Sequence, residues 1–102
     1  MKRILLVCNL GMSTSMLVQR MEKAAKEQGI EAEITAVPLT TAEKMINEWD
    51  VVMLGPQVRH NLKQLTALGS KTPIEVIDMR DYGLMNGYAV LTKALELIEN
   101  KK

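Results

Sequence analysis

The residue types that the chain lacks limit what it can do. Among its 102 residues there are no phenylalanines, one tryptophan, two tyrosines, one cysteine and one histidine. A single cysteine cannot form an internal disulfide, which is typical of proteins that work in a reducing cytoplasm. One cysteine and one histidine, without carboxylates at ligand spacing, do not make a metal site. We therefore predict neither a metal nor another cofactor.

Long apolar runs and an excess of charge are absent as well. No segment approaches the roughly 20 apolar residues that a membrane-spanning helix needs, and the short apolar stretch near Met1 does not make a signal peptide. The formal net charge is +1 and the lysines are scattered, which argues against a nucleic-acid partner. We expect residues 1–102 to form a single cytoplasmic domain, monomeric and without direct membrane insertion.

Methionine is abundant where aromatic residues are scarce. The chain has 8 methionines, so flexible thioethers must fill much of the core. Met12, Met16 and Met85 are predicted to lie around Cys8, where they offer an adaptable docking surface. For Met16, however, a place in the core is the favoured prediction.

Short apolar runs alternate with segments of helical periodicity. We predict strands at residues 3–7, 31–37, 51–54 and 74–79, and helices at 14–28, from 40 onward, at 58–68 and at 88–99. This alternation predicts an α/β fold, a four-stranded parallel sheet with helices on both faces. The predicted strand order is 2-1-3-4, with the second strand at an edge. The first strand then ends where the winding direction reverses, which is where such sheets bind ligands.

Local signals mark the ends of these elements. Gly29 is predicted to end the first helix, and Gly69 the third. The run from Thr40 to Glu43 matches a capping box, and residues 81–87, with two glycines, are predicted to form a loop. The residues predicted to face the core from the helices are apolar at helical spacing: Leu17, Met21, Ala24, Ala25, Ala42, Met45, Ile46, Val58, Leu62, Leu65, Leu68, Leu91, Ala94, Leu95 and Ile98.

The cysteine lies between a strand and a helix, in the segment C-N-L-G-M-S-T-S at residues 8–15. Backbone N–H groups at such a turn, and in the first turn of a helix, lack internal partners and can bind an anion. Cys8 is then a candidate nucleophile for a phosphoryl group, and Gly11 permits the tight turn. The predicted phosphate-binding loop consists of Asn9, Leu10, Gly11, Met12, Ser13, Thr14 and Ser15.

Two other interpretations of this segment stay open. A lone cysteine at a strand end can be simply a small buried apolar residue, in a binding module without chemistry. Cysteine-dependent phosphatases on a similar scaffold use Cys-x5-Arg, but Thr14 stands at the arginine position here. Hydrogen bonds to a charged group contribute about 1.5–3 kcal/mol each, so a phosphatase without that arginine is handicapped. A small cysteine phosphatase or arsenate-reductase-like enzyme is therefore the alternative, although no second cysteine is available for arsenate reduction.

Further motifs follow in order along the chain. They are V-V-M-L-G-P-Q at residues 51–57, E-V-I-D at 75–78 and Tyr82-Gly83. Together with the cysteine segment they closely resemble the enzyme IIB component of the lactose/cellobiose/chitobiose branch of the bacterial sugar phosphotransferase system. The resemblance covers nearly the whole chain. It implies a fold like that of low-molecular-weight phosphotyrosine phosphatase.

The resemblance also implies a function and partners. Cys8 would take a phosphoryl group from a phosphohistidine of enzyme IIA and pass it to a sugar, of the β-linked disaccharide class, held by the membrane component enzyme IIC. Residues 9–15 would bind the phosphate. One departure is Asn86-Gly87, where relatives often have Asp-Gly, and this puts any role of that loop in doubt.

Two residues outside the loop are candidates for supporting the site. Gln57 can either donate a hydrogen bond to the site or cap the helix that follows it. Tyr82 can either border the phosphate or pack the turn after the fourth strand. His60, the only histidine, is predicted to be a solvated helix residue rather than a phosphoryl carrier.

Overall fold

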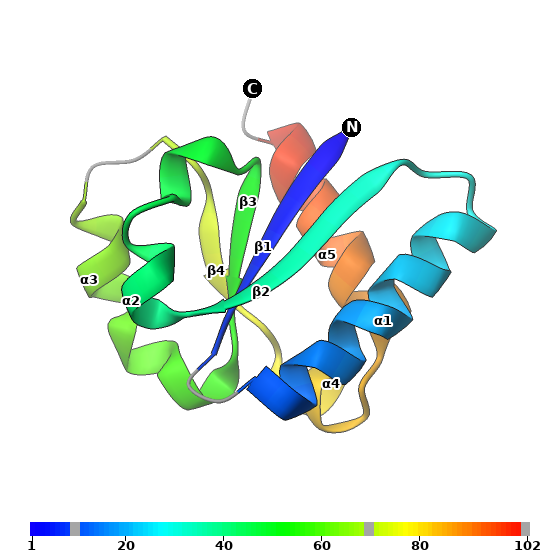
Figure 1. Cartoon of the computed structure of the whole chain (residues 1–102), viewed down its shortest axis with the longest axis horizontal. Helices are drawn as coiled ribbons and strands as arrows, with labels where there is room; N and C mark the ends of the chain where they lie inside the picture. Colours follow the sequence, from blue (N-terminus) through cyan, green and yellow to red (C-terminus); the bar gives the residue numbers. More distant parts are fainter. Residues whose placement is uncertain (9–10, 69–70, 101–102) are drawn as a thin grey trace.

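Four parallel strands form the centre of the molecule (Figure 1). A computed structural model describes residues 1–8, 11–68 and 71–100, and for residues 11–14 it describes the backbone alone. The strand order β2-β1-β3-β4 confirms the predicted topology and leaves β2 at one edge. The bounds of the strands are β1 (Lys2–Cys8), β2 (Ala32–Pro38), β3 (Val51–Leu54) and β4 (Ile74–Val76).

The sheet separates two apolar cores because successive side chains of a strand point to opposite faces. Ile4 and Leu6 of β1 pack with α1 and α5 on one face. Leu5 and Val7 pack on the other face with four shorter elements. The long helices of the first face are α1 (Gly11–Glu27) and α5 (Gly87–Asn100), and α4 (Met79–Gly83) adds Tyr82 to the same core. The elements of the second face are α2 (Leu39–Ala42), η1 (Ile46–Glu48), η2 (Pro56–Asn61) and α3 (Leu62–Thr66).

Helix α1 begins at Gly11, three residues before the predicted start, and ends as the sequence predicts. Gly29 has a positive φ of 70°, which glycine adopts at little cost. Its N–H donates to Lys26 O, and the N–H of Ile30 donates to Ala25 O. These two bonds make a Schellman motif, in which Ile30 also packs against the core that contains Ala25. The local signal at Gly29 therefore fixes where the chain leaves α1.

The predicted capping box after β2 is wrong. Helix α2 starts at Leu39, and its N-cap is Pro38, with an extended ψ of 162° and no side-chain cap bond. Strand β2 runs up to Pro38, whose fixed φ suits the entry to a helix. Thr40 is therefore already inside the helix, where its hydroxyl cannot act as the cap.

The predicted continuous helix at 58–68 is broken into two pieces. The 3-10 segment η2 precedes α3, and Val58 between its two parts has non-helical dihedral angles of −115° and 19°. Val58 and Leu65 are both fully buried in the second core. Leu68 was predicted to face the core as well, but it is 53% exposed. The break lets both buried side chains reach the sheet. Gly69, the predicted stop, lies outside the described residues.

The end of the fourth strand and the residues that follow it also differ from the prediction. Strand β4 stops at Val76, and the predicted loop at 81–87 overlaps a helix, α4 (Met79–Gly83). Asp78 caps this helix, because its Oδ1 accepts hydrogen bonds from the N–H groups of Arg80 at 2.9 Å and Asp81 at 3.3 Å. The cap ends the extended segment before Met79, which is why the strand is shorter than its apolar run suggests.

Candidate functional site

Cys8 is the last residue of β1, at the carboxyl end of the sheet. The connection from β1 to β2 passes through α1 on one face, and the connection from β2 to β3 passes through α2 and η1 on the other. The winding therefore reverses between β1 and β3, where ligands of such sheets bind. Cys8 is only 2% exposed. Its thiol is thus held at the end of the sheet rather than extended into solvent.

The N-terminus of α1 follows Cys8 closely. The helix begins at Gly11, so its first-turn N–H groups, which have no intrahelical acceptors, start three positions after the thiol. These donors and the positive end of the helix dipole favour an anion there. Of the predicted loop, Asn9 and Leu10 lie outside the described residues, residues 11–14 form the first turn of α1, and Ser15 is an exposed residue of the same helix.

Gln57 lies beside the same strand ends. Its Oε1 is 2.7 Å from the point that a Cβ of Gly55 would occupy, and Cys8 Cβ is 3.7 Å from that point. Gly55 is the N-cap of η2, so Gln57 is already within the 3-10 segment and does not cap it. The structure thus removes the capping alternative for Gln57 and brings its carboxamide towards the cysteine.

Tyr82 borders the same region from α4. It is buried, with 8% of its surface exposed, and packs in the first core. Together with Gln57 it lines a shallow groove of about 500 Å³ between η2 and α4. Arg59 and His60, both exposed, also line the groove. The packing role predicted for Tyr82 is thus seen in the structure, and its role beside the phosphate stays a prediction.

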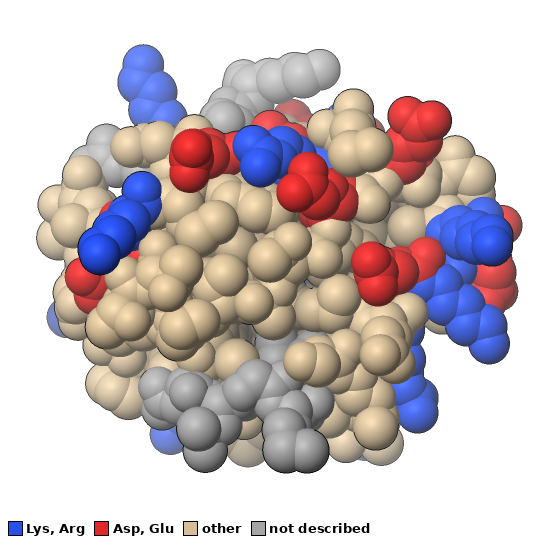
Figure 2. Space-filling model, viewed as in Figure 1, with Lys and Arg blue, Asp and Glu red and all other residues tan. Residues whose placement is uncertain are grey.

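Large apolar side chains on α1 and at the ends of α4 are exposed. Met16 on α1 is 51% exposed, so its predicted place in the core is wrong. Position 16 lies one residue before buried Leu17, on the outward face of the helix. Met79 and Leu84, at the two ends of α4, are 62% and 66% exposed. Figure 2 shows further uncharged surface in the middle of one face, where residues 34–42 contain no charged residue.

The Asn86-Gly87 pair has a structural role at the start of α5. Asn86 Oδ1 accepts a hydrogen bond from the N–H of Ala89 at 3.1 Å, which caps the helix. Gly87 packs on α1, because a Cβ there would lie 2.5 Å from the carbonyl carbon of Arg20. An aspartate caps a helix as well as an asparagine does. The departure from the Asp-Gly of relatives is therefore conservative at this position.

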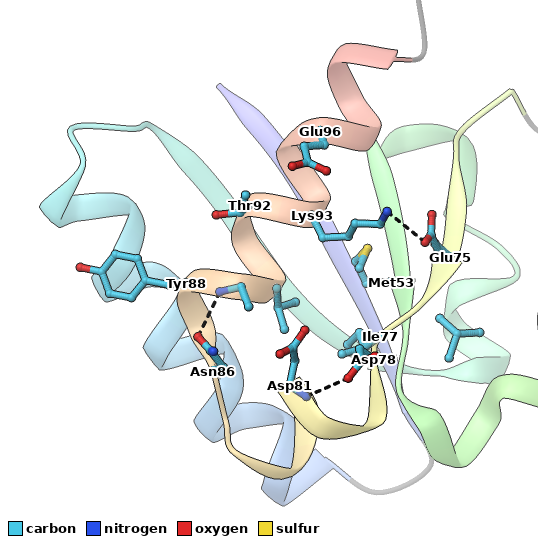
Figure 3. Close-up of a pocket in the computed structure, with 13 residues that line it drawn as sticks. Met53, Glu75, Ile77, Asp78, Asp81, Asn86, Tyr88, Thr92, Lys93 and Glu96 are labelled. Atoms are coloured by element: carbon cyan, nitrogen blue, oxygen red, sulfur yellow. Dashed lines mark hydrogen bonds and ion pairs between the residues drawn. The ribbon is translucent and has the colours of Figure 1, made fainter.

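A larger hollow, of about 720 Å³, lies between β4 and α5 (Figure 3). Four of its polar side chains already have structural roles. Lys93 Nζ pairs with Glu75 Oε1 at 3.4 Å, while Asp78 and Asn86 cap α4 and α5. Size alone is a poor guide here, because the predicted nucleophile, Cys8, and the N-terminus of α1 lie outside this hollow. We therefore take the Cys8 end of the sheet as the candidate site.

Two further observations concern other kinds of site. Within residues 1–8, 11–68 and 71–100, no three histidine, cysteine, aspartate or glutamate side chains gather as metal ligands. No helix in this described part is long and apolar enough to cross a membrane.

Comparison with known proteins agrees with the resemblance seen in the motifs. Residues 3–93 match the family described as "PTS system, Lactose/Cellobiose specific IIB subunit". The oligo-β-mannoside-specific EIIB component of Bacillus subtilis is 40% identical over 99% of this chain and 100% of that protein. The galactose-specific EIIB component of Lactococcus lactis subsp. cremoris is 39% identical over 95% of this chain and 96% of its own length.

Solved structures give the same assignment. The cellobiose-specific phosphotransferase IIB component of Borrelia burgdorferi is 48% identical, with a TM-score of 0.83 over 99% of this chain and 94% of that one. The lactose-specific IIB domain of Streptococcus pneumoniae, only 15% identical, shares the fold with a TM-score of 0.82 over 93% and 95% of the two chains. The chain therefore belongs to the lactose/cellobiose-specific IIB family of phosphotransferase subunits of the sugar phosphotransferase system.

Proposed function

We propose that Cys8 carries a phosphoryl group between enzyme IIA and a sugar bound to enzyme IIC. In the first step the thiolate Sγ attacks phosphorus, the N–P bond of the phosphohistidine breaks, and the histidine nitrogen keeps the electron pair. In the second step a sugar hydroxyl attacks phosphorus, the S–P bond breaks, and the hydroxyl proton leaves. The observation that carries this proposal is the position of Cys8 at the end of β1, followed within three residues by the N-terminus of α1.

Uncharged hydrogen-bond donors suit a phosphoryl carrier better than a positively charged arginine side chain does. The first-turn N–H groups of α1 stabilise phosphoryl oxygens without a full positive charge. Thr14 stands where phosphatases have arginine, so the phosphoryl group is bound less tightly and can move on. Asp78 would be one source of a general acid, but its Oδ1 is already bonded to two N–H groups of α4. These features argue against the alternative, a phosphatase or arsenate-reductase-like enzyme.

The partners and substrate class follow from the family. Relatives are specific for oligo-β-mannosides, galactose and cellobiose, and we propose a β-linked disaccharide for this chain. We propose that residues 1–102 act as a single cytoplasmic domain and as a monomer. Met16, Met79 and Leu84 are exposed apolar side chains of α1 and of the two ends of α4, which suit transient contact with two partners.

A reconstituted sugar-phosphorylation assay tests this function. It combines the general components of the phosphotransferase system with a matching enzyme IIA, membranes that contain enzyme IIC, and cellobiose. Cys8→Ser should abolish phosphorylation of the sugar, because a serine hydroxyl is a much weaker nucleophile than a cysteine sulfur. His60→Gln is the matched control, since it removes the only histidine, and it should retain activity. Full activity of Cys8→Ser, or rapid hydrolysis of an aryl phosphate by the wild-type protein, would overturn the proposal.

A further inference from the structure

The side chain of Gln57 occupies space that only a glycine at position 55 leaves open. Gln57 is exposed, and yet its Oε1 lies 2.7 Å from the point where a Cβ of residue 55 would be. No real Cβ tolerates a neighbour under 3.0 Å, so any larger residue at position 55 forces the glutamine to move. A long polar side chain at the surface is thus folded back over the end of β3. This conformation needs Gly55.

The same empty space borders the cysteine. Cys8 Cβ is 3.7 Å from the Cβ position of Gly55, so the cysteine and the carboxamide of Gln57 lie within 4 Å of one point. The backbone holds this arrangement, because Gly55 N donates to Val7 O at 2.8 Å. Pro56 then fixes the first residue of η2 and sets the direction in which Gln57 leaves the strand. The carboxamide of Gln57 and the Cβ of the residue that we propose to be phosphorylated thus border the same space above Gly55.

We propose that Gln57 is a phosphate-binding residue of the carrier, and that Gly55 acts through it as a positioning residue. This inference rests on the proposed function, since it concerns the phosphoryl group on Cys8. The carboxamide, once turned so that its N–H groups face the phosphoryl oxygens, offers two neutral donors from η2, in addition to the first-turn N–H groups of α1. The bond is charge-assisted but brings no cation to the site. It favours phosphocysteine without the tight retention that an arginine would give.

The test measures the equilibrium between phosphorylated enzyme IIA and phosphorylated Cys8, by intact mass, for a set of variants. Gln57→Ala should lower the equilibrium constant for transfer to Cys8 by roughly tenfold, the effect of one hydrogen bond to a charged group. Gln57→Glu keeps the shape but repels the phosphoryl group, so its loss should be larger still. Gln64→Ala is the matched control, because that glutamine bonds Asn61 and Glu43 on the surface of η2 and α2.

A double-mutant cycle tests the role of Gly55. Gly55→Ala should displace Gln57 and reduce the same equilibrium constant about as much as Gln57→Ala does. The double variant should then be no worse than either single variant, because the glycine acts only through the glutamine. Thermal unfolding of each variant separates this effect from a loss of stability, which would not alter the equilibrium constant of the folded fraction.

The outcomes distinguish this inference from the function on which it rests. If the wild-type protein takes no phosphoryl group at Cys8 from an active donor, the proposed function itself fails. If the wild type is phosphorylated and Gln57→Ala matches Gln64→Ala, the function stands and the role of Gln57 is refuted. Independent, additive losses in the double variant would refute the claim that Gly55 acts through Gln57.

Discussion

Gly55 donates its backbone N–H to the carbonyl oxygen of Val7 at 2.8 Å. This hydrogen bond continues the pairing of β1 with β3 one residue beyond the last strand pair, Val7 with Leu54. It joins the segment that carries Gln57 to the residue just before Cys8. The candidate site is therefore built where two strand ends are held together, and the helix termini around it are positioned by the packing of the rest of the chain.

The contact of Gly87 with α1 should be essential for stability. A Cβ at position 87 would lie 2.5 to 2.8 Å from three atoms of Arg20, two of them backbone atoms, so Gly87→Ala must push α5 away from α1. We expect a loss of about 1–3 kcal/mol, the usual cost of overpacking. Gly83→Ala is the control, because nothing lies within 4 Å of its Cβ position. Denaturant unfolding followed by the fluorescence of buried Trp49 measures both, and equal stabilities would contradict the account.

The cap of α5 should tolerate an aspartate at position 86. Asn86→Ala removes the acceptor for the N–H of Ala89 and should cost about 1 kcal/mol of stability. Asn86→Asp keeps the acceptor and adds a negative charge at the N-terminal end of the helix, so it should be neutral or slightly stabilising. Thermal unfolding of the two variants distinguishes them. A loss for Asn86→Asp as large as for Asn86→Ala would show that position 86 has another role.

Tyr88 links α5 to the C-terminal end of α1. The hydrogen bond from its hydroxyl to Glu27, then the loss of hydration and the negative charge of Glu27, raise the pKa of Tyr88 above its ordinary value. The proton is therefore held more tightly in the folded state. The stability that this pair adds is fully present below about pH 10, where unfolded tyrosine is protonated, and is lost as the pH rises through the folded pKa.

The titration of Tyr88 can be followed by ultraviolet absorbance. A Tyr82→Phe background leaves Tyr88 as the only tyrosine. Adding Glu27→Gln should lower the midpoint of the titration, because the negative charge is removed and the hydrogen bond becomes weaker. An unchanged midpoint would mean that the pair does not persist in solution.

An arginine at the phosphatase position should slow the carrier. Thr14→Arg is expected to hold the phosphoryl group through added charge-assisted hydrogen bonds, worth about 1.5–3 kcal/mol each. Phosphocysteine should then accumulate while transfer to the sugar becomes slower. The measurement is single-turnover transfer to cellobiose on membranes with enzyme IIC, and Thr14→Lys serves as a cation without the bidentate geometry. An unchanged transfer rate in Thr14→Arg would refute the idea.

Most of the fold was predictable because its main signals are local. The wholly apolar runs identify β1 and β3 as strands covered on both faces, and Gly29 closes α1 through its own positive φ. The strand order then follows from the alternation of strands and helices. The errors lie in short elements, where a single capping residue decides at which position the helix begins. Asp78 starts α4 and Pro38 starts α2, and in both places a longer sequence pattern suggested another boundary.

The candidate site was only partly predictable from sequence. Cys8 and its predicted loop are consecutive in the chain, so a single sequence segment was enough to predict them. The proximity of Gly55 and Gln57 to Cys8 depends on how the end of β3 lies beside β1, and the motif G-P-Q does not reveal this by itself. The exposure of Met16 was missed because a methionine next to buried Leu17 fits a helix face either way. Tertiary packing decides such cases.

Mapping the phosphoryl group tests the central claim most directly. The wild-type protein is incubated with the general components of the phosphotransferase system, phosphoenolpyruvate and a matching enzyme IIA, and then analysed by intact mass and by peptide sequencing under conditions that preserve thiophosphate bonds. The account predicts the mass of a single added phosphoryl group, located on Cys8, which disappears when enzyme IIC membranes and cellobiose are added. A protein that stays unmodified with an active donor, or an adduct on His60 instead, would contradict it.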